Sequence, residues 1–426
     1  MTERLYYNDS FLYEFDATVM AIQERDGRTV VVLDRTAFYP ASGGQIFDTG
    51  WLQLNGGKLR VAEVAEDESG SIVHYIEGTI DPLLQGATVH GEIDSKRRHD
   101  HMQQHSGQHV LSAAFERLFA MPTVSFHMGD ESCTIDLAAK ALSDEQVRAA
   151  EREANRVASE DLTVSIKSAS VEAARAMGVR KIPDHVEGDL RLIDMEGYDL
   201  NACGGTHVRS TGQIGAILLR KYEKVKQGFR VEFVCGERAV ATARKDFETL
   251  TEAAGLFATH IWEVPSLIRK SLDESKAATK ERKKLLEELA ELLAGRMLAE
   301  SETVFLEASA NSEPEAGESK QGFKLVTSAF DDRDTVFIKL LAQKITASQP
   351  AVALFGAKLG QPGVVFAQSP GLPNDMGALL KQALESLGGR GGGNRDLAQG
   401  GVVNSEAMGE AIAAAAAKIQ REGRSR

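Results

Sequence analysis

Apolar and polar residues alternate along short runs in the first hundred positions, and glycine-containing turns separate the runs. Examples are residues 29–33, 58–61, 71–75 and 88–93. Alternation with a period of two is typical of strands that bury one face. Short strands at regular spacing favour a small antiparallel barrel or sheet. We therefore expect residues 1–93 to form a small N-terminal β-barrel.

Helical spacing replaces this alternation after residue 94. Leu111 and Phe115 share one face of a helix that we predict over residues 95–119. Strand patterns follow, together with a second helix that begins at Ser143, where a Ser and a Gln three residues later form a capping box. These features predict an α+β domain over residues 94–236.

Leucines at helical spacing dominate the next segment, and they predict a helical hairpin or short coiled coil followed by an acidic linker over residues 237–318. Strand and helix signals then alternate over residues 319–426, as in an α/β module. A run of glycines, Gly388–Asn394, lies between the last two predicted helices. The fold class as a whole is α+β.

Composition and charge exclude several classes of protein. The 426 residues carry a formal net charge of -13, which is unpromising for a protein that grips a phosphate backbone. No apolar run is long enough for a membrane span and no signal peptide is evident, so we expect a cytoplasmic protein without a membrane partner. Three cysteines cannot form a disulfide framework. We expect Cys133 and Cys235 to be small buried residues.

Two motifs carry metal-ligand chemistry. Residues four apart share a helix face, so His101, His105 and His109 form a stripe from which two neighbouring imidazoles can reach one ion. Cys203 and His207 also lie four apart, across a Gly-Gly turn that can fold both side chains onto one cation. Together the two motifs suit Zn2+.

The alternatives to a zinc site are weaker but concrete. The histidines could line a polar helix face, and the cysteine could be buried beside an ordinary glycine turn. A metalloprotease is disfavoured because Ser106, not Glu, follows His105. A metal phosphohydrolase would rest on the His99-Asp100 dipeptide alone.

Five segments resemble the editing region of alanyl-tRNA synthetases and their free-standing AlaX-type relatives, in the order of that family. The last of them is similar to the signature of the DHH-associated C-terminal domain. The segments are Phe38–Gly50, His105–His109 with Cys203–Val208, Thr211–Gly215, Cys235–Ala239, and Gly388–Gly393 with Ala398–Gly400.

The resemblance implies one Zn2+ per chain, held by His105, His109, Cys203 and His207. Only 37 residues precede Phe38, so we expect a free-standing editing protein without an aminoacylation domain. The implied reaction is hydrolysis of the ester in tRNA(Ala) misacylated with serine, or with glycine. Four protein ligands leave open whether the metal activates water or only positions the substrate.

Other functions and further residues complete the prediction. The alternatives are a non-catalytic tRNA-binding or assembly module and a deacylase acting on misacylated tRNA(Thr). Polar side chains near the ligand motifs are candidate pocket residues, namely Gln108, Thr206, Ser125 and Gln45. The tRNA contacts that we predict from basic patches and the glycine run are Lys96, Arg97, Arg98, Arg220, Lys221, Lys224, Arg390, Asn394 and Arg395. The helical hairpin or the C-terminal domain is a candidate homodimer contact.

Overall fold

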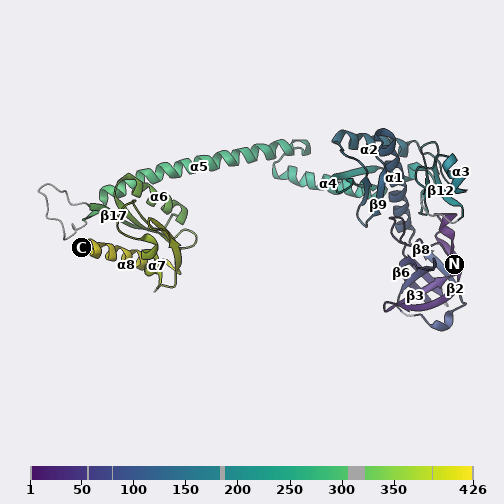
Figure 1. Ribbon diagram of the computed structural model, residues 1–426, viewed down its shortest axis with the longest axis horizontal. Helices are drawn as coiled ribbons and strands as arrows, with labels where there is room; N and C mark the ends of the chain where they lie inside the picture. Colours follow the sequence, from purple (N-terminus) through teal and green to yellow (C-terminus); the bar gives the residue numbers. More distant parts are fainter. Residues whose placement is uncertain are drawn as a thin grey trace. The chain divides into compact units, whose positions relative to one another are not determined.

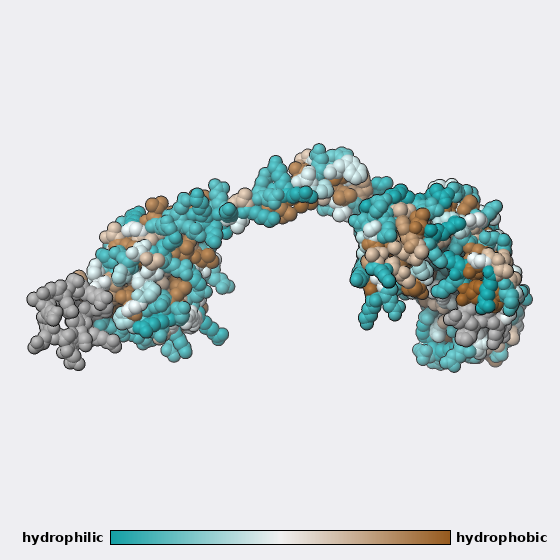
Figure 2. Space-filling view, turned by 45° about the horizontal axis from the view of Figure 1, so that its top comes forward, coloured by the Kyte–Doolittle hydropathy of each residue, from teal (hydrophilic) through white to brown (hydrophobic). Residues whose placement is uncertain are grey.

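The structure of the chain is a computed structural model that describes residues 2–54, 57–78, 80–182, 188–305, 322–385 and 387–424. It divides into two compact units, Met1–Ile261 and Trp262–Arg426. The visible surfaces of both units are mainly hydrophilic, with hydrophobic residues scattered among them (Figure 2). Within the described ranges, no helix combines the length and apolar character that crossing a membrane requires.

A closed six-stranded barrel forms the N-terminal part of the first unit, as the alternating pattern predicts. Inward-facing apolar residues such as Val31, Val61 and Val89 fill its interior. A short parallel pair, β1 (Glu3–Arg4) and β4 (Arg35–Thr36), lies beside it. In barrel order the strands are β2 (Glu14–Arg25), β3 (Arg28–Leu33), β7 (Ile72–Glu77), β6 (Gly57–Glu66), β5 (Gly50–Leu54) and β8 (Thr88–Ile93).

Helix α1 (Ser95–Phe119) is the central element of the first unit and has the predicted bounds. Asp94 caps its start by accepting a hydrogen bond from the Arg97 amide, and Ala120 ends it in the left-handed conformation. Its middle is buried on all sides by the surrounding elements. Helix α2 (Asp144–Ser159) begins at the predicted capping box of Ser143 and Gln146.

Two antiparallel sheets and two further helices complete the unit (Figure 1). The four-stranded sheet packs its apolar side chains against α1 and α2. In sheet order its strands are β14 (Ile217–Val225), β15 (Gly228–Cys235), β10 (Cys133–Leu137) and β9 (Thr123–Met128). The three-stranded sheet contains β11 (Val164–Ala169), β12 (Leu190–Met195) and β13 (Asp199–Ala202). The helices are α3 (Val171–Ala176) and α4 (Gly236–Leu256).

The second unit is a six-stranded sheet with helices on both faces (Figure 1). Helices α5 (Val264–Glu300) and α6 (Thr335–Ser348) share one apolar core with the sheet, and α7 (Met376–Glu385) and α8 (Ser405–Arg424) share the other. In sheet order the strands are β16 (Glu302–Phe305), β17 (Gly322–Phe330), β18 (Ala351–Ala357), β19 (Gly363–Gln368), β21 (Leu397–Gly401) and β20 (Arg390–Gly393).

The predicted helical segment over 237–318 is divided between the units. Helix α4 belongs to the first unit, whereas Ala290, Ala294 and Leu298 of α5 are buried against α6 in the second. The predicted acidic linker, residues 311–320, lies outside the described residues.

The glycine run forms the edge strand β20, which the sequence did not predict. Its glycines allow a close approach to the neighbouring strand and to α7. A Cβ on Gly391 would lie 2.7 Å from the Gly400 Cα and 2.9 Å from a Leu380 methyl, and a Cβ on Gly393 would lie 2.2 Å from the Leu397 carbonyl. Gly392 faces open space.

A buried ion pair joins the barrel to α1. Arg98 is fully buried and donates to the Asp48 carboxylate, with Nε at 3.0 and 3.1 Å from the two oxygens. It also donates to the carbonyls of Ser10 (2.8 Å) and Ala37 (2.6 Å), and Asp48 accepts from the Tyr39 amide. The prediction that Arg98 contacts tRNA is therefore wrong, because its guanidinium is satisfied inside the protein and cannot reach a phosphate.

Replacing this arginine should destabilise the first unit strongly. Arg98→Met leaves the Asp48 carboxylate buried without its partner, which should lower the free energy of unfolding by about 3–5 kcal/mol. The neighbouring Arg97→Met, at a partly exposed position, is the matched control and should lower it by less than about 1 kcal/mol. Denaturant unfolding of the two variants measures the difference, and equal losses would contradict the structural role of Arg98.

The barrel interior should also respond to acid through His74. This ring is fully buried; its Nδ1 lies 3.0 Å from the Val31 carbonyl, so it donates there, and Nε2 accepts from the Thr36 hydroxyl at 2.9 Å. Burial lowers the pKa of His74 from 6.5 to about 4. Between pH 6.5 and 4 the unfolded chain therefore binds a proton at His74 that the folded chain does not bind.

Stability contributed by neutral His74 should thus be complete above pH 6.5 and decline as the pH falls towards 4. The expected slope from this group is about 1.4 kcal/mol per pH unit within that window. Unfolding free energies at pH 7 and 5.5 should differ less in His74→Gln than in the parent chain, since the carboxylates common to both proteins cancel. An unchanged pH dependence would refute this assignment.

Candidate functional site

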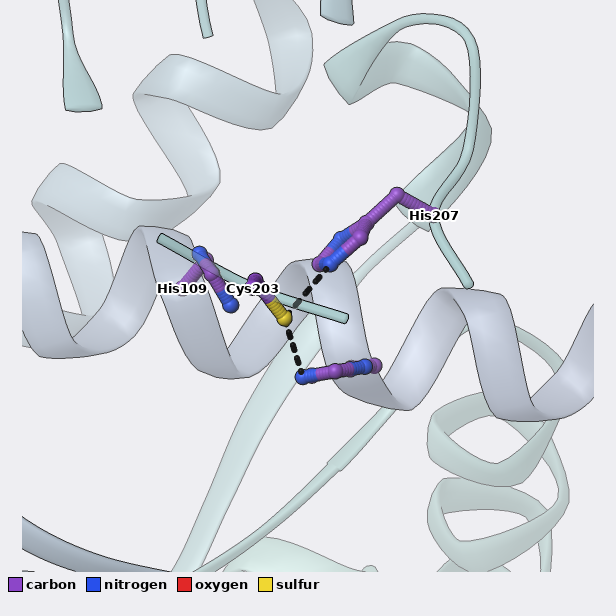
Figure 3. Close-up of side chains that lie close together, drawn as sticks. His109, Cys203 and His207 are labelled. Carbon is purple, nitrogen blue, oxygen red and sulfur yellow. Dashed lines mark hydrogen bonds between the residues drawn. The ribbon is translucent and has the colours of Figure 1, made fainter. Parts of the chain in front are cut away.

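Four predicted ligands converge at one point in the first unit. His105 and His109 lie one turn apart on α1, and Cys203 and His207 come from the loop between β13 and the short helix η3 (Thr211–Ile214). Their ligand atoms all lie within 4.8 Å of one another. The Cys203 Sγ is 3.3 Å from His207 Nε2 and 3.5 Å from His105 Nε2 (Figure 3). His101 is not in this cluster.

Burial and mutual charge give Cys203 and His207 the protonation states that a metal needs. Burial alone raises the pKa of the Cys203 thiol, but His105 and His207 outweigh it and hold that pKa well below 9. Burial, followed by the charge of His105, lowers the pKa of His207 to about 3. A thiolate and a neutral imidazole are the forms that coordinate a metal.

Each histidine of the cluster has a partner for its other ring nitrogen. His105 Nδ1 lies 2.8 Å from Gln45 Oε1, and His207 Nδ1 lies 3.1 Å from the Ser106 hydroxyl. His109 Nδ1 lies 3.5 Å from the Asp199 carboxylate, an ion-pair distance without hydrogen-bond geometry. Burial lowers the pKa of His109, but Asp199 and Cys203 more than compensate and raise it to about 9.

The Cys-Gly-Gly-Thr-His loop depends on its second glycine. A Cβ on Gly205 would lie 2.1 Å from His105 Cε1, so no other residue fits without displacing the ring. Arg191 braces the same loop by donating to the carbonyls of Cys203 (2.6 Å) and Gly205 (2.9 Å). The loop therefore places the side chains of Cys203 and His207 next to α1.

Two candidate pocket residues lie beside the ligands. Thr206 is buried and its hydroxyl accepts a hydrogen bond from Gln45 Nε2 at 2.8 Å. Gln108 is buried and donates to the Ser112 hydroxyl at 2.8 Å, within α1. A role for either in the reaction stays a prediction.

Ser125 is a different case, because its side chain is exposed and donates to Asp136 at 2.8 Å. Successive side chains of a strand point to opposite faces, and the neighbouring Phe126 is the residue of β9 that faces the cluster. Its ring stacks on His105, with centroids 5.5 Å apart and planes 11° apart. The prediction that Ser125 lines the site is therefore wrong, and its neighbour Phe126 forms the wall of the site instead.

Sequence reasoning missed this ring together with Arg191, Ser106 and Asp199. Strand alternation on β9 could have favoured Phe126 over Ser125, whereas no local signal marks the other three. Cys133 and Cys235 are fully buried, as predicted.

The predicted basic contacts divide into paired and available groups. Arg220 pairs with Asp246, and Lys221 lies 3.4 Å from Glu232. Arg97 is partly buried, lies 3.9 Å from Asp130 and donates to the Phe47 carbonyl at 3.1 Å. The exposed Lys96 lies beside it at a surface cavity at the start of α1. Lys224, Arg390 and Arg395 are exposed. Asn394 instead caps a turn, accepting from the amides of Asp396 and Leu397.

Two regions of the chain match known protein families. Residues 3–97 match the family described as tRNA synthetases class II (A), and residues 190–231 match the threonyl and alanyl tRNA synthetase second additional domain. The alanine–tRNA ligase of Pyrococcus furiosus is 33% identical over 421 residues, which cover 96% of this chain but 43% of the ligase. The chain thus spans less than half of that relative. The structure of the C-Ala domain of Aquifex aeolicus alanyl-tRNA synthetase matches 24% of this chain at 23% identity, with a TM-score of 0.21.

A relative of matching length identifies the family. The alanyl-tRNA editing protein AlaX-L of Pyrococcus horikoshii is 30% identical over 407 residues, covering 94% of this chain and 95% of its own. The chain therefore belongs to the AlaX-L family of alanyl-tRNA editing proteins.

Proposed function

We propose that the chain is a zinc-dependent aminoacyl-tRNA deacylase, a hydrolase and not an aminoacylating ligase. Its substrate is tRNA(Ala) misacylated with serine, and secondarily with glycine, in the cytoplasm. The observation that carries the proposal is the convergence of His105, His109, Cys203 and His207 in a chain of the AlaX-L family.

The donor set fits zinc. One thiolate and three imidazoles are the nitrogen and sulfur ligands that tetrahedral Zn2+ prefers, and they come from two segments nearly a hundred residues apart. When bound there, the ion supplies Lewis-acid stabilisation of charge on an ester oxygen. Cys203 is the one ligand of the four that is only partly buried, which favours approach of the substrate ester from its side.

The proposed preference for serine is supported by a buried hydroxyl beside the ligands. The Thr206 hydroxyl accepts from Gln45 and keeps its own proton for a further acceptor, such as the hydroxyl of a bound serine. Alanine would leave that group unpaired, which disfavours the correct product. Phe126 stacks on His105 and provides an apolar side to the cluster.

The tRNA contacts that we retain are on basic groups that are exposed or, for Arg97, partly exposed. Lys96 and Arg97 lie two turns before His105 on α1, and Lys224 lies on the edge strand β14. In the second unit Arg390 lies on β20, next to the open face of Gly392. Local patches of this kind can bind a phosphate backbone although the whole chain is acidic.

A homodimer through the helical segment or the C-terminal domain stays a prediction, to be checked by sedimentation.

Deacylation assays should identify the substrate. Seryl-tRNA(Ala) should be hydrolysed fastest, glycyl-tRNA(Ala) more slowly and alanyl-tRNA(Ala) least. Seryl-tRNA(Thr) is the essential control, because the matched second additional domain is common to threonyl and alanyl synthetases. Preference for that substrate would move the chain to the threonine branch, and tRNA binding without turnover would indicate a non-catalytic module.

Loss of the metal should abolish the same activity. The parent chain should contain about one zinc per molecule by elemental analysis, and Cys203→Ala should lower both zinc content and deacylation by at least about 10-fold. Cys133→Ala is the matched control, since that buried cysteine lies outside the cluster. Full activity of a Cys203→Ala, His207→Ala double variant would refute the proposal.

Neutralising basic groups should reduce the salt dependence of tRNA binding. Neutralising one basic group that pairs with a phosphate should lower the steepness of the plot of log association constant against log salt concentration by roughly 0.7–0.9. We therefore expect Lys96→Gln with Lys224→Gln to reduce the slope by about 1.5. Lys58→Gln with Lys358→Gln, two lysines paired with acids, should leave it nearly unchanged. Equal slopes in both double variants would show that the binding face is elsewhere.

A further inference from the structure

A single buried carboxamide, that of Gln45, connects the barrel to the ligand cluster. The residue is 1% exposed and ends the turn Ser42–Gln45. Gly43 and Gly44 build this turn with φ of +60° and +87°, values that favour glycine. A Cβ on Gly44 would also lie 2.3 Å from the Phe126 carbonyl oxygen, so the turn fits closely against β9.

The hydrogen bonds of Gln45 determine which atom is which. One amide atom lies 3.1 Å from the Thr206 backbone nitrogen, which can only donate, so this atom is the oxygen Oε1. The same oxygen lies 2.8 Å from His105 Nδ1, which must therefore carry a proton to donate to it. The other amide atom, Nε2, donates to the Thr206 hydroxyl at 2.8 Å.

This arrangement sets the tautomer of His105. With the proton on Nδ1, the lone pair is on Nε2, and Nε2 is the atom that lies 3.5 Å from Cys203 Sγ. The ring cannot turn away, because Phe126 stacks on one face and Gly205 lies against its edge. The same amide holds Thr206, between the two ligands of the loop.

We propose that Gln45 is the positioning residue of this site. It fixes His105 in the Nδ1–H tautomer, which leaves the lone pair on Nε2, the atom beside Cys203 Sγ that would bind the metal, and it ties the loop Cys203–His207 to the barrel. The inference rests on the proposed zinc site, which it deepens by giving the barrel a part in metal binding. Removing a partner of this kind typically changes metal affinity by about 10- to 100-fold.

Zinc affinity of three variants of the full chain tests the proposal, by competition with a chromogenic chelator. Gln45→Leu removes every polar contact, whereas Gln45→Glu keeps an acceptor for His105 and for the Thr206 amide. Gln104→Leu is the matched control. This glutamine precedes His105 and is also buried, but its amide bonds to Asp100 and to the Cys235 backbone instead of to a ligand side chain.

We expect Gln45→Leu to weaken zinc binding by about 10- to 100-fold and Gln45→Glu by less than about threefold. Gln104→Leu should lower stability but leave zinc affinity close to that of the parent. Equal zinc affinities of Gln45→Leu and Gln104→Leu would overturn the proposal. If Gln45→Leu does not fold, Gln45→Asn serves, because it shortens the side chain by one methylene and withdraws the amide from His105.

Nitrogen NMR of histidine-labelled parent chain gives a readout independent of affinity and activity. We expect His105 to show a protonated Nδ1, and in Gln45→Leu or Gln45→Asn a mixture of tautomers. A protonated Nε2 in the zinc-loaded parent would refute the role of Gln45 while leaving the deacylase proposal intact. Conversely, a parent chain that binds no zinc would refute the zinc-dependent function itself.

Discussion

The buried pair of Arg98 and Asp48 is the interaction on which the first unit depends. It joins three segments that are distant in sequence: the N-terminal loop at Ser10, the barrel at Ala37 and Asp48, and the first turn of α1. A charge inside a protein is tolerated only when its partners satisfy it, so the pair admits one arrangement of barrel and helix. That arrangement places Gln45 of the barrel against His105 of the helix, and the ligand cluster is built where they meet.

Burial sets the chemistry of the cluster by acting differently on each group. The pKa of His207 falls because burial penalises its cation, whereas His105 and His207 lower the pKa of Cys203 in spite of burial. A thiolate beside the neutral ring of His207 attracts a divalent cation, whereas His109, whose pKa Asp199 and Cys203 raise to about 9, would release its proton when a metal binds. The surrounding hydrogen bonds hold the donors in these states, so the protein presents a site whose ligands need little rearrangement to bind.

Local patterns predicted the elements, but not which side chains the fold would bury. Alternation identified the barrel, helical spacing gave the bounds of α1, and Ser143 with Gln146 gave the start of α2. In the sequence, Arg98 cannot be distinguished from its basic neighbours Lys96 and Arg97. It has a structural role because the fold buries it against Asp48, fifty residues earlier in the chain. Strand β20 was not predicted because glycine has no intrinsic preference for strands. The segment is a strand because the tertiary fold pairs it with β21. The convergence of the cluster was predictable because each pair, His105 with His109 and Cys203 with His207, is spaced so that both side chains can reach one point.

The glycine strand at the edge of the second unit has a consequence for how the protein behaves at high concentration. In the described sheet β20 is terminal, so one side of it presents amides and carbonyls with no neighbouring strand. Sheet edges are normally guarded by bulky or charged side chains, yet here the inner glycines cannot be enlarged without displacing Leu380 or the β21 backbone. Arg390 is the only charged residue of β20, so its charge alone opposes pairing of this strand with the sheet edges of other molecules. The exposed backbone of this edge therefore carries a risk of self-aggregation, which any partner that pairs with or covers the edge would reduce.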